Sequence, residues 1–309
     1  MQNIRFDIPT SAPFRLDLTV WVLRRRKTNR IDSWNGKIYR RAMTLDSQIV
    51  LASVEQKGPP GSAVLAVDLA CENPSPQTRL AAESALIRLL GLDVDLSGFY
   101  AMAFADAQLA PLAEKFIGVR PPLYPTLFES IANAIVLQQI SLDAGMSVLN
   151  RLTEIYGARF NYRHEVFYLF PEVRCLAGLG VEEIRRAGLT ANKARALAEC
   201  AGQIMERGLS LEYFEEMDNE TAFNELVKFR GIGRWSADYI LLRGLGRLDV
   251  FPQGDIGARA RLNSLLRSDG KLSDLDVANI VKKWQGYGGI VYFHLLLSGL
   301  ADKGLMCLF

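Results

Sequence analysis

One short glycine-containing segment constrains the fold of this chain more than any other part of its sequence. Gly231 and Gly233 flank a single isoleucine between two runs of helical pattern, which predicts a tight turn between two helices. Glycine lacks a Cβ, so the backbone of such a turn can approach another molecule, and the next helix begins with free N–H groups. Arg234 adds a full positive charge there. The segment is a candidate phosphate site, although such turns also occur in plain helix packing.

The residues that follow the turn give further support for a binding site. Trp235 and Tyr239 are spaced i, i+4, so both lie on one face of the expected helix. Pro252 and Gly254 interrupt any helix before Asp255, which places that aspartate where a new helix begins. An aspartate in this position is by itself typical of a helix N-cap. The pattern therefore indicates two aromatic rings on one helix face and a carboxylate at the start of a later helix, with helix capping as the simpler role of that carboxylate.

Four separated segments occur in the order and spacing of one known family. They are residues 127–141, which end in Gln-Gln-Ile-Ser, residues 188–197, residues 229–239 with the later Asp255, and residues 284–289. On these segments the chain resembles the helix-hairpin-helix (HhH-GPD) DNA glycosylases, and within them the bacterial 3-methyladenine DNA glycosylase II type. The resemblance covers roughly residues 120 to 300.

The resemblance implies a monofunctional DNA glycosylase that flips an alkylated purine out of double-stranded DNA and hydrolyses its glycosidic bond, leaving an abasic site in base excision repair. Asp255 occupies the position of the family's catalytic aspartate, whose charge stabilises the developing positive charge on the sugar. Family members that also cut the strand carry a lysine where this chain has Trp235, so water is the expected nucleophile. Two alternatives stay open: a glycosylase for oxidised or deaminated bases such as 8-oxoguanine or hypoxanthine, and a non-catalytic lesion-binding protein.

The base pocket is expected, by position in the family, to contain Trp235, Tyr239 and Tyr287. Aromatic faces attract cationic alkylated purines through stacking and cation–π interactions. Tyr287 stands where the alkylation enzymes commonly have tryptophan, which leaves the preferred base open. Ordinary core packing is the alternative role for each of these rings.

The DNA contacts are also expected from the resemblance. Gln138 and Gln139 align with the wedge that fills the gap left by a flipped nucleotide, although both could simply cap the helix turn. Gly231, Gly233 and Arg234 are expected to bind a DNA phosphate, a contact that depends on salt and not on base sequence.

Metal and cofactor chemistry has little support in the sequence. The cysteines share no C-x-x-C spacing, so neither a zinc site nor an iron–sulfur cluster is expected; they are Cys71, Cys175, Cys200 and Cys307. Of the two histidines, His294 lies in an apolar run and is expected in the core. In the family the hairpin often holds a monovalent cation on backbone carbonyls, which residues 229–233 could supply without a side-chain ligand.

The first hundred residues differ in pattern from the rest. Apolar and polar residues alternate over 14–22, which predicts a half-buried strand, and further strands are expected over 48–55 and 63–70. A helix is predicted over 76–90, between a Ser-Pro start and a glycine stop.

The expected fold class is α+β, with a small antiparallel-sheet domain, similar to the TBP-like domain of the family, before a mostly helical glycosylase core. The predicted boundaries are 1–105 for the first domain and 106–309 for the core. From residue 99 onward the pattern is helical almost throughout.

Charge and hydropathy narrow the class of partner. A net charge of +2 is too small to indicate nucleic acid, but residues 24–41 hold eight basic residues against Asp32, a local charge of +7. Such a run is most typical of solvated surface, and DNA contact is the alternative. The longest apolar run, 290–300, is too short to span a bilayer. We therefore expect a monomeric, cytoplasmic, nucleoid-associated protein without a membrane partner.

Overall fold

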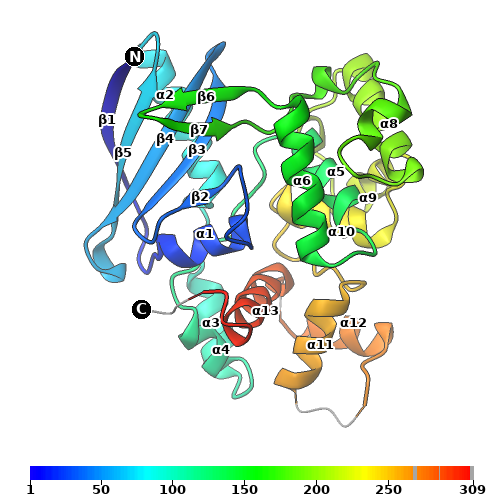
Figure 1. The fold of residues 1–309 in the computed structure, drawn as a ribbon. Coiled ribbons are helices and arrows are strands. Elements are labelled where there is room, and N and C mark those ends of the chain that lie inside the picture. Colours follow the sequence, from blue (N-terminus) through cyan, green and yellow to red (C-terminus); the bar gives the residue numbers. More distant parts are fainter. Residues whose placement is uncertain (267–269, 285, 307–309) are drawn as a thin grey trace.

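The chain folds into an antiparallel sheet on one side and a larger body of helices on the other (Figure 1). The computed structural model describes residues 1–266, 270–284 and 286–306. Its five-stranded sheet has the order β1-β5-β4-β3-β2, and every neighbouring pair is antiparallel. These strands are β1 (Gln2–Pro9), β2 (Ser33–Trp34), β3 (Ile38–Leu45), β4 (Gln48–Lys57) and β5 (Val64–Cys71). The α+β class and the strands predicted over 48–55 and 63–70 are confirmed.

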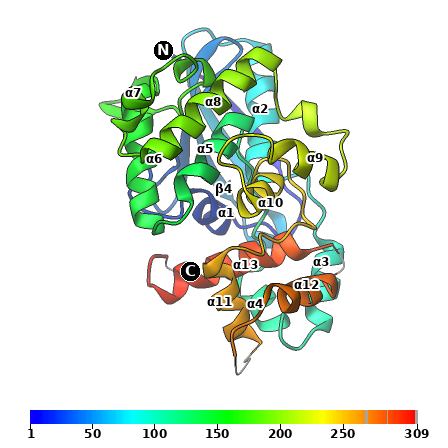
Figure 2. The same cartoon turned by 90° about the vertical axis from the view of Figure 1, so that its right-hand side faces the viewer.

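Helices lie against the sheet and build the second half of the molecule (Figure 2). In chain order they are α1 (Leu16–Arg24), α2 (Pro76–Leu90), α3 (Ser97–Ala105), α4 (Ala110–Lys115), α5 (Leu127–Leu137), α6 (Leu142–Tyr156), α7 (Val181–Arg185), α8 (Ala191–Arg207), α9 (Asn219–Leu226), α10 (Arg234–Arg243), α11 (Ile256–Leu265), α12 (Asp274–Lys282) and α13 (Gly288–Asp302), with short 3-10 turns at η1 (Pro60–Ser62), η2 (Val173–Cys175) and η3 (Glu212–Phe214). Helix α2 confirms the prediction over 76–90: Ser75 caps its start, and Gly91 ends it at a φ of 60°. Among the described residues, no helix has the length and apolar character needed to cross a membrane.

The strand predicted over 14–22 is wrong, because this segment forms helix α1. The helix is packed on two sides, and every residue in it except Asp17 is buried. Asp17 and Thr19 fall between apolar residues, so the segment also alternates as a strand would. One face joins the core beneath the sheet and the other joins the core around α13: Leu16, Val20 and Leu23 on the first, and Leu18, Trp21 and Val22 on the second. Burial on both sides thus mimicked the alternation of a strand.

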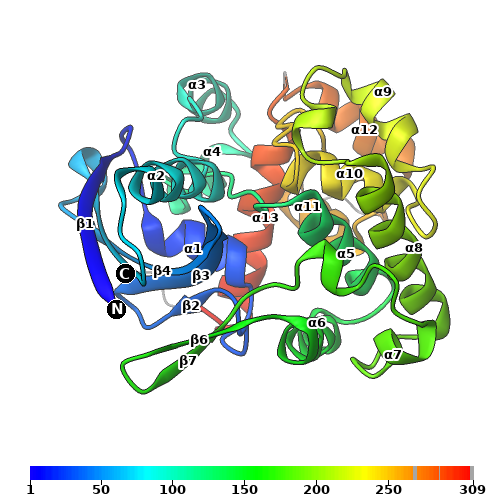
Figure 3. The same ribbon diagram turned by 90° about the horizontal axis from the view of Figure 1, so that it is seen from above.

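A β-hairpin interrupts the region predicted to be helical from residue 99 onward. Strands β6 (Arg159–Tyr162) and β7 (Glu165–Tyr168) are joined by a two-residue turn in which both residues have positive φ. The hairpin reaches across to the sheet, where Phe160 and Phe167 pack with Ala42, Leu51 and Ala70 (Figure 3). It therefore ties the helical half of the molecule to the sheet.

Helix α13 occupies the middle of the molecule, where it contacts α1, α4 and α11 (Figures 2 and 3). His294 is buried in it, and burial lowers the pKa of its imidazole to about 4, so the predicted core role is confirmed. Helix α3, which the predicted boundary at residue 105 assigns to the first domain, packs with α4 and shares the core around α13. The boundary itself stays a prediction.

Candidate active site

The predicted turn between two helices lies between α9 and α10. Gly231 has a φ of 80°, which disfavours residues with a Cβ. A Cβ added there would also lie 2.9 Å from the Cβ of Ala196 on α8. Gly233 is the N-cap of α10 and leaves the first amides of that helix without an intrahelical acceptor. The glycines thus allow a close helix–helix approach and an exposed helix N-terminus in the same turn.

Asp255 has two roles at the start of α11. Its Oδ1 accepts a hydrogen bond from Ala258 N at 2.9 Å, which is the predicted N-cap contact. Its Oδ2 accepts a hydrogen bond from the Tyr292 hydroxyl at 2.9 Å and a longer one from Trp235 Nε1 at 3.4 Å. Capping therefore uses one carboxylate oxygen, and the other is held between two aromatic side chains from α10 and α13.

Two of the three aromatic residues predicted for the base pocket lie together. The Trp235 ring stacks on Tyr239 with centroids 5.3 Å apart and an interplanar angle of 26°. Tyr239 is fully buried, and its hydroxyl lies 2.8 Å from that of Tyr124. Trp235 is only half-buried and also touches Asp255, so it forms the accessible surface and Tyr239 supports it from behind.

Tyr287 lies in a different environment. Its ring meets Phe99 of α3 edge-on with centroids 6.0 Å apart, and its hydroxyl fills the space beside Gly98. The structure does not bring this ring onto the Trp235 stack. In the same segment, residues 284–289, Gly289 allows α13 to approach the main chain that follows α10. The N–H of Gly289 donates to Leu248 O at 2.7 Å. Position 285 of the motif lies outside the described residues.

Sequence reasoning missed Tyr292, whose hydroxyl contacts Asp255. Burial, and next the charge of Asp255, raise the pKa of Tyr292 well above that of a free tyrosine. The side chain therefore stays protonated and donates to the carboxylate. The only signal in the sequence is a phenolic hydroxyl within the apolar run 290–300.

The two glutamines predicted as a DNA wedge have different surroundings. Gln138 donates from Nε2 to Gly231 O at 2.7 Å and to Ser236 Oγ at 2.6 Å, so it ties the end of α5 to the glycine turn between α9 and α10. Gln139 is exposed and has a φ of 53°. Lys193 of α8 donates to the carbonyls of Val136 and Gln138, at 2.9 and 2.6 Å, and holds this turn in place. Only Gln139 is free to project from the protein.

The glycine turn between α9 and α10 is the segment expected to bind a phosphate and a cation. Arg234 is exposed, and its guanidinium carbon lies 5.3 Å from the centre of the Phe223 ring. The carbonyls of Phe229 and Gly231 already accept hydrogen bonds from Ile232 N and Gln138, which leaves one lone pair on each. Within the described part of the chain, no three His, Cys, Asp or Glu side chains are grouped to hold a metal, and Cys307 lies outside that part.

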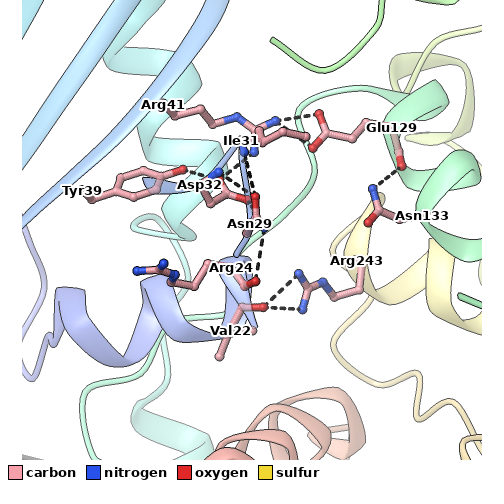
Figure 4. Close-up of polar contacts among 10 residues, drawn as sticks. All are labelled: Val22, Arg24, Asn29, Ile31, Asp32, Tyr39, Arg41, Glu129, Asn133 and Arg243. Carbon is pink, nitrogen blue, oxygen red and sulfur yellow. Dashed lines mark hydrogen bonds and ion pairs between the residues drawn. The ribbon is translucent and has the colours of Figure 1, made fainter. Parts of the chain in front are cut away.

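The solvated surface predicted for the arginine-rich segment 24–41 is wrong for four of its members, because Arg24, Arg25, Arg26 and Arg41 are buried. Figure 4 shows how one of these cations, Arg41, is held. Arg41 of β3 donates to Asp32 at 2.9 Å and to both oxygens of Glu129 on α5 at 2.7 and 2.6 Å. This ion network joins the sheet to the helix that carries the Gln138 turn. Arg24 instead donates to backbone carbonyls, and Arg26 pairs with Asp143 of α6. These tertiary contacts, which a sequence pattern does not report, explain the error.

A narrow recess lies between the end of α1, α5 and α6. Leu23, Arg25, Tyr124, Leu137 and Met146 are among its lining residues. Tyr124 and Arg25 also contact Tyr239, so the recess adjoins the Trp235 stack.

Comparison with known proteins places this geometry in a family. Residues 132–286 match the family described as HhH-GPD superfamily base excision DNA repair protein. A DNA-3-methyladenine glycosylase of Bacillus subtilis is 31% identical over 208 residues, which are 66% of this chain and 69% of that protein. The DNA-3-methyladenine glycosylase 2 of Escherichia coli is 26% identical over 178 residues, which are 58% of this chain and 60% of that protein.

Solved structures are similar over nearly the whole chain. The 3-methyladenine DNA glycosylase from Archaeoglobus fulgidus superposes with a TM-score of 0.84 at 26% identity and covers 94% of this chain and 97% of its own. An 8-oxoguanine glycosylase/lyase of Clostridium acetobutylicum, in complex with double-stranded DNA, has a TM-score of 0.76 at 17% identity and covers 97% of this chain and 98% of its own. At this identity, the similarity to the Clostridium acetobutylicum enzyme shows a shared fold and nothing about function.

Proposed function

This chain belongs to the HhH-GPD superfamily of base excision DNA repair proteins, and on that premise we propose that it is a monofunctional DNA glycosylase that excises alkylated purines. The arrangement around Asp255 carries the proposal. One carboxylate oxygen caps a helix, while the other is held by Tyr292 and Trp235 at the exposed edge of an aromatic stack. A fixed negative charge beside an aromatic surface suits a reaction in which positive charge develops on a sugar next to a stacked base.

The proposed reaction follows from these contacts. The bond between the sugar carbon and the base nitrogen breaks, and the base leaves with the electron pair. The Asp255 carboxylate stabilises the resulting positive charge on the sugar, and its orientation is set by Tyr292 and Trp235. A water molecule then bonds to the sugar carbon, and its proton passes to Asp255. No lysine stands at position 235, which supports water as the nucleophile and an abasic site as the product.

The proposed DNA contacts lie around the same site. The free amides after Gly233, together with Arg234, bind a backbone phosphate. Gln139, exposed at the turn after α5, fills the space left by the extruded base. A monovalent cation on the carbonyls of Phe229 and Gly231 would add positive charge beside that phosphate. We propose that the protein acts as a monomer on DNA in the nucleoid.

Base release from defined duplexes tests the proposal. The duplexes carry 7-methylguanine, 3-methyladenine, 1,N6-ethenoadenine, hypoxanthine, uracil or 8-oxoguanine, and each is incubated with the wild type and with Asp255→Asn. We expect release of methylated purines, strand breaks only after alkali, and a loss of at least roughly 100-fold in the Asn variant. Strand breaks without alkali would contradict the monofunctional assignment.

The same experiment separates the alternatives. Release of 8-oxoguanine or hypoxanthine without any methylated purine would assign a different base specificity to the same Asp255 chemistry. Binding of damaged duplexes by both proteins, without release of any base, would assign a lesion-binding role instead.

A further inference from the structure

Arg25 differs from the arginines on either side of it. Arg24 donates to the backbone carbonyls of Arg26, Lys27 and Trp34, and Arg26 is paired with Asp143. Arg25 is 6% exposed, and its buried Nε and Nη2 have no hydrogen-bond partner among the described residues. Three consecutive arginines are therefore buried, and of these three only Arg25 has buried side-chain nitrogens without a hydrogen-bond partner among the described residues.

The main chain holds Arg25 in an unfavourable conformation. It follows the last residue of α1 with a φ of 54°, in the left-handed region that residues with a Cβ seldom adopt. Its own N–H donates to Trp21 O at 3.0 Å, and its carbonyl accepts from Arg26 Nη1 at 3.0 Å. This backbone conformation directs the side chain inward, whereas Arg24 and Arg26 reach their own partners.

The guanidinium of Arg25 lies beside the residues assigned to the reaction. Its carbon is 5.4 Å from the centre of the Tyr239 ring, the same ring on which Trp235 stacks. Burial alone would lower the pKa of its guanidinium, but the neighbouring acidic groups, Asp255 among them, raise that pKa above the value of a free arginine. The side chain also lines the narrow recess between α1, α5 and α6. It therefore stands as a permanent cation at the boundary between the recess and the Asp255 side.

A buried guanidinium without acceptors is costly, because each desolvated N–H loses its hydrogen bond to water. Nearly all buried polar groups in proteins find a partner, so an exception needs an explanation. The Tyr239 ring offers a cation–π contact but accepts no hydrogen bond from Nε and Nη2 in the plane of the guanidinium. A ligand with acceptor atoms would satisfy these donors.

We propose that Arg25 is a specificity-determining residue that donates hydrogen bonds from Nε and Nη2 to an acceptor edge of the extruded base, and that it favours neutral purine lesions over cationic ones. The inference rests on the proposed function. A carbonyl oxygen and an adjacent ring nitrogen, as in hypoxanthine, match the two donors of a guanidinium edge. A base with a full positive charge gains from the aromatic faces but is repelled by Arg25, so this cation opposes the selectivity that Trp235 provides.

The test compares two lesions in the binding and the excision steps. Binding to duplexes with hypoxanthine or 7-methylguanine is measured in the Asp255→Asn background, with and without Arg25→Met, and excision is measured with Asp255 intact. We expect Arg25→Met to lower the preference for hypoxanthine over 7-methylguanine roughly 10- to 100-fold in both assays. Arg25→Lys, which keeps the charge but not the planar fork, should restore only part of this preference.

Arg24→Met is the matched control, because the donors of Arg24 go to backbone carbonyls and not toward the site. It should lower the melting temperature and leave the lesion preference unchanged. An unchanged preference in folded Arg25→Met overturns the inference, and should that variant not fold, an unchanged preference in Arg25→Lys does so. If the wild type releases no base while Arg25 still sets the binding preference, the proposed enzyme function fails and the role of Arg25 stands.

Discussion

At the scale of single residues, the hydroxyl of Tyr292 decides how one oxygen of Asp255 is held. Tyr292→Phe removes the 2.9 Å hydrogen bond to Oδ2 and leaves only the longer contact from Trp235. Hydrogen bonds to charged groups contribute about 1.5–3 kcal/mol, so we expect base release in single-turnover experiments to slow roughly 10- to 100-fold. Affinity for damaged duplex should change little, since Tyr292 is almost fully buried.

Tyr100→Phe is the matched control for that prediction. Its hydroxyl accepts a hydrogen bond from Gly118 N at 2.8 Å, so the same chemical change costs one hydrogen bond away from Asp255. A similar loss of rate in both variants would mean that Tyr292 acts through general stability and not through the carboxylate.

At the scale of elements, the cation of Lys193 joins the start of α8 to the end of α5. Lys193→Met leaves the carbonyls of Val136 and Gln138 without this donor and frees the turn that carries Gln139. We expect a loss of about 1–3 kcal/mol in stability and faster amide exchange in peptides covering residues 136–142. Hydrogen exchange followed by mass spectrometry, together with thermal melting, measures both.

Lys228→Met is the matched control for Lys193→Met. Lys228 forms an exposed ion pair with Glu225 on α9, and such pairs contribute little to stability. Equal amide exchange at 136–142 in wild type and Lys193→Met would show that other contacts hold the turn.

At the scale of the whole molecule, the network of Asp32, Arg41 and Glu129 joins the sheet to α5 in the interior (Figure 4). Arg41→Met leaves two buried carboxylates without their cation, and we expect a loss of about 3–5 kcal/mol in urea unfolding. Adding Asp32→Asn and Glu129→Gln removes the uncompensated charges and should recover part of that loss. If the triple variant is as unstable as Arg41→Met, packing and not charge is responsible.

The elements of this fold differ in how well local sequence determined them. Helix α2 was predictable because its start and stop depend on a serine, a proline and a glycine that act within a few residues. Helix α1 was predicted as a strand, because burial on two sides placed apolar residues on either side of Asp17 and Thr19 and produced a period of two. The hairpin of β6 and β7 owes its place to packing on the distant strands β3 and β4, which no local pattern encodes.

The candidate site shows the same division. The sequence by itself determined the glycine turn, the cap at Asp255 and the stacking of Trp235 on Tyr239, because all three depend on spacing along one or two neighbouring helices. Only the tertiary structure placed Tyr292 against Asp255 and buried Arg25 beside Tyr239, where its Nε and Nη2 have no hydrogen-bond partner among the described residues. Those contacts join residues more than thirty positions apart, and the desolvation that gives a buried charge its effect exists only once the sheet and the helices have packed together.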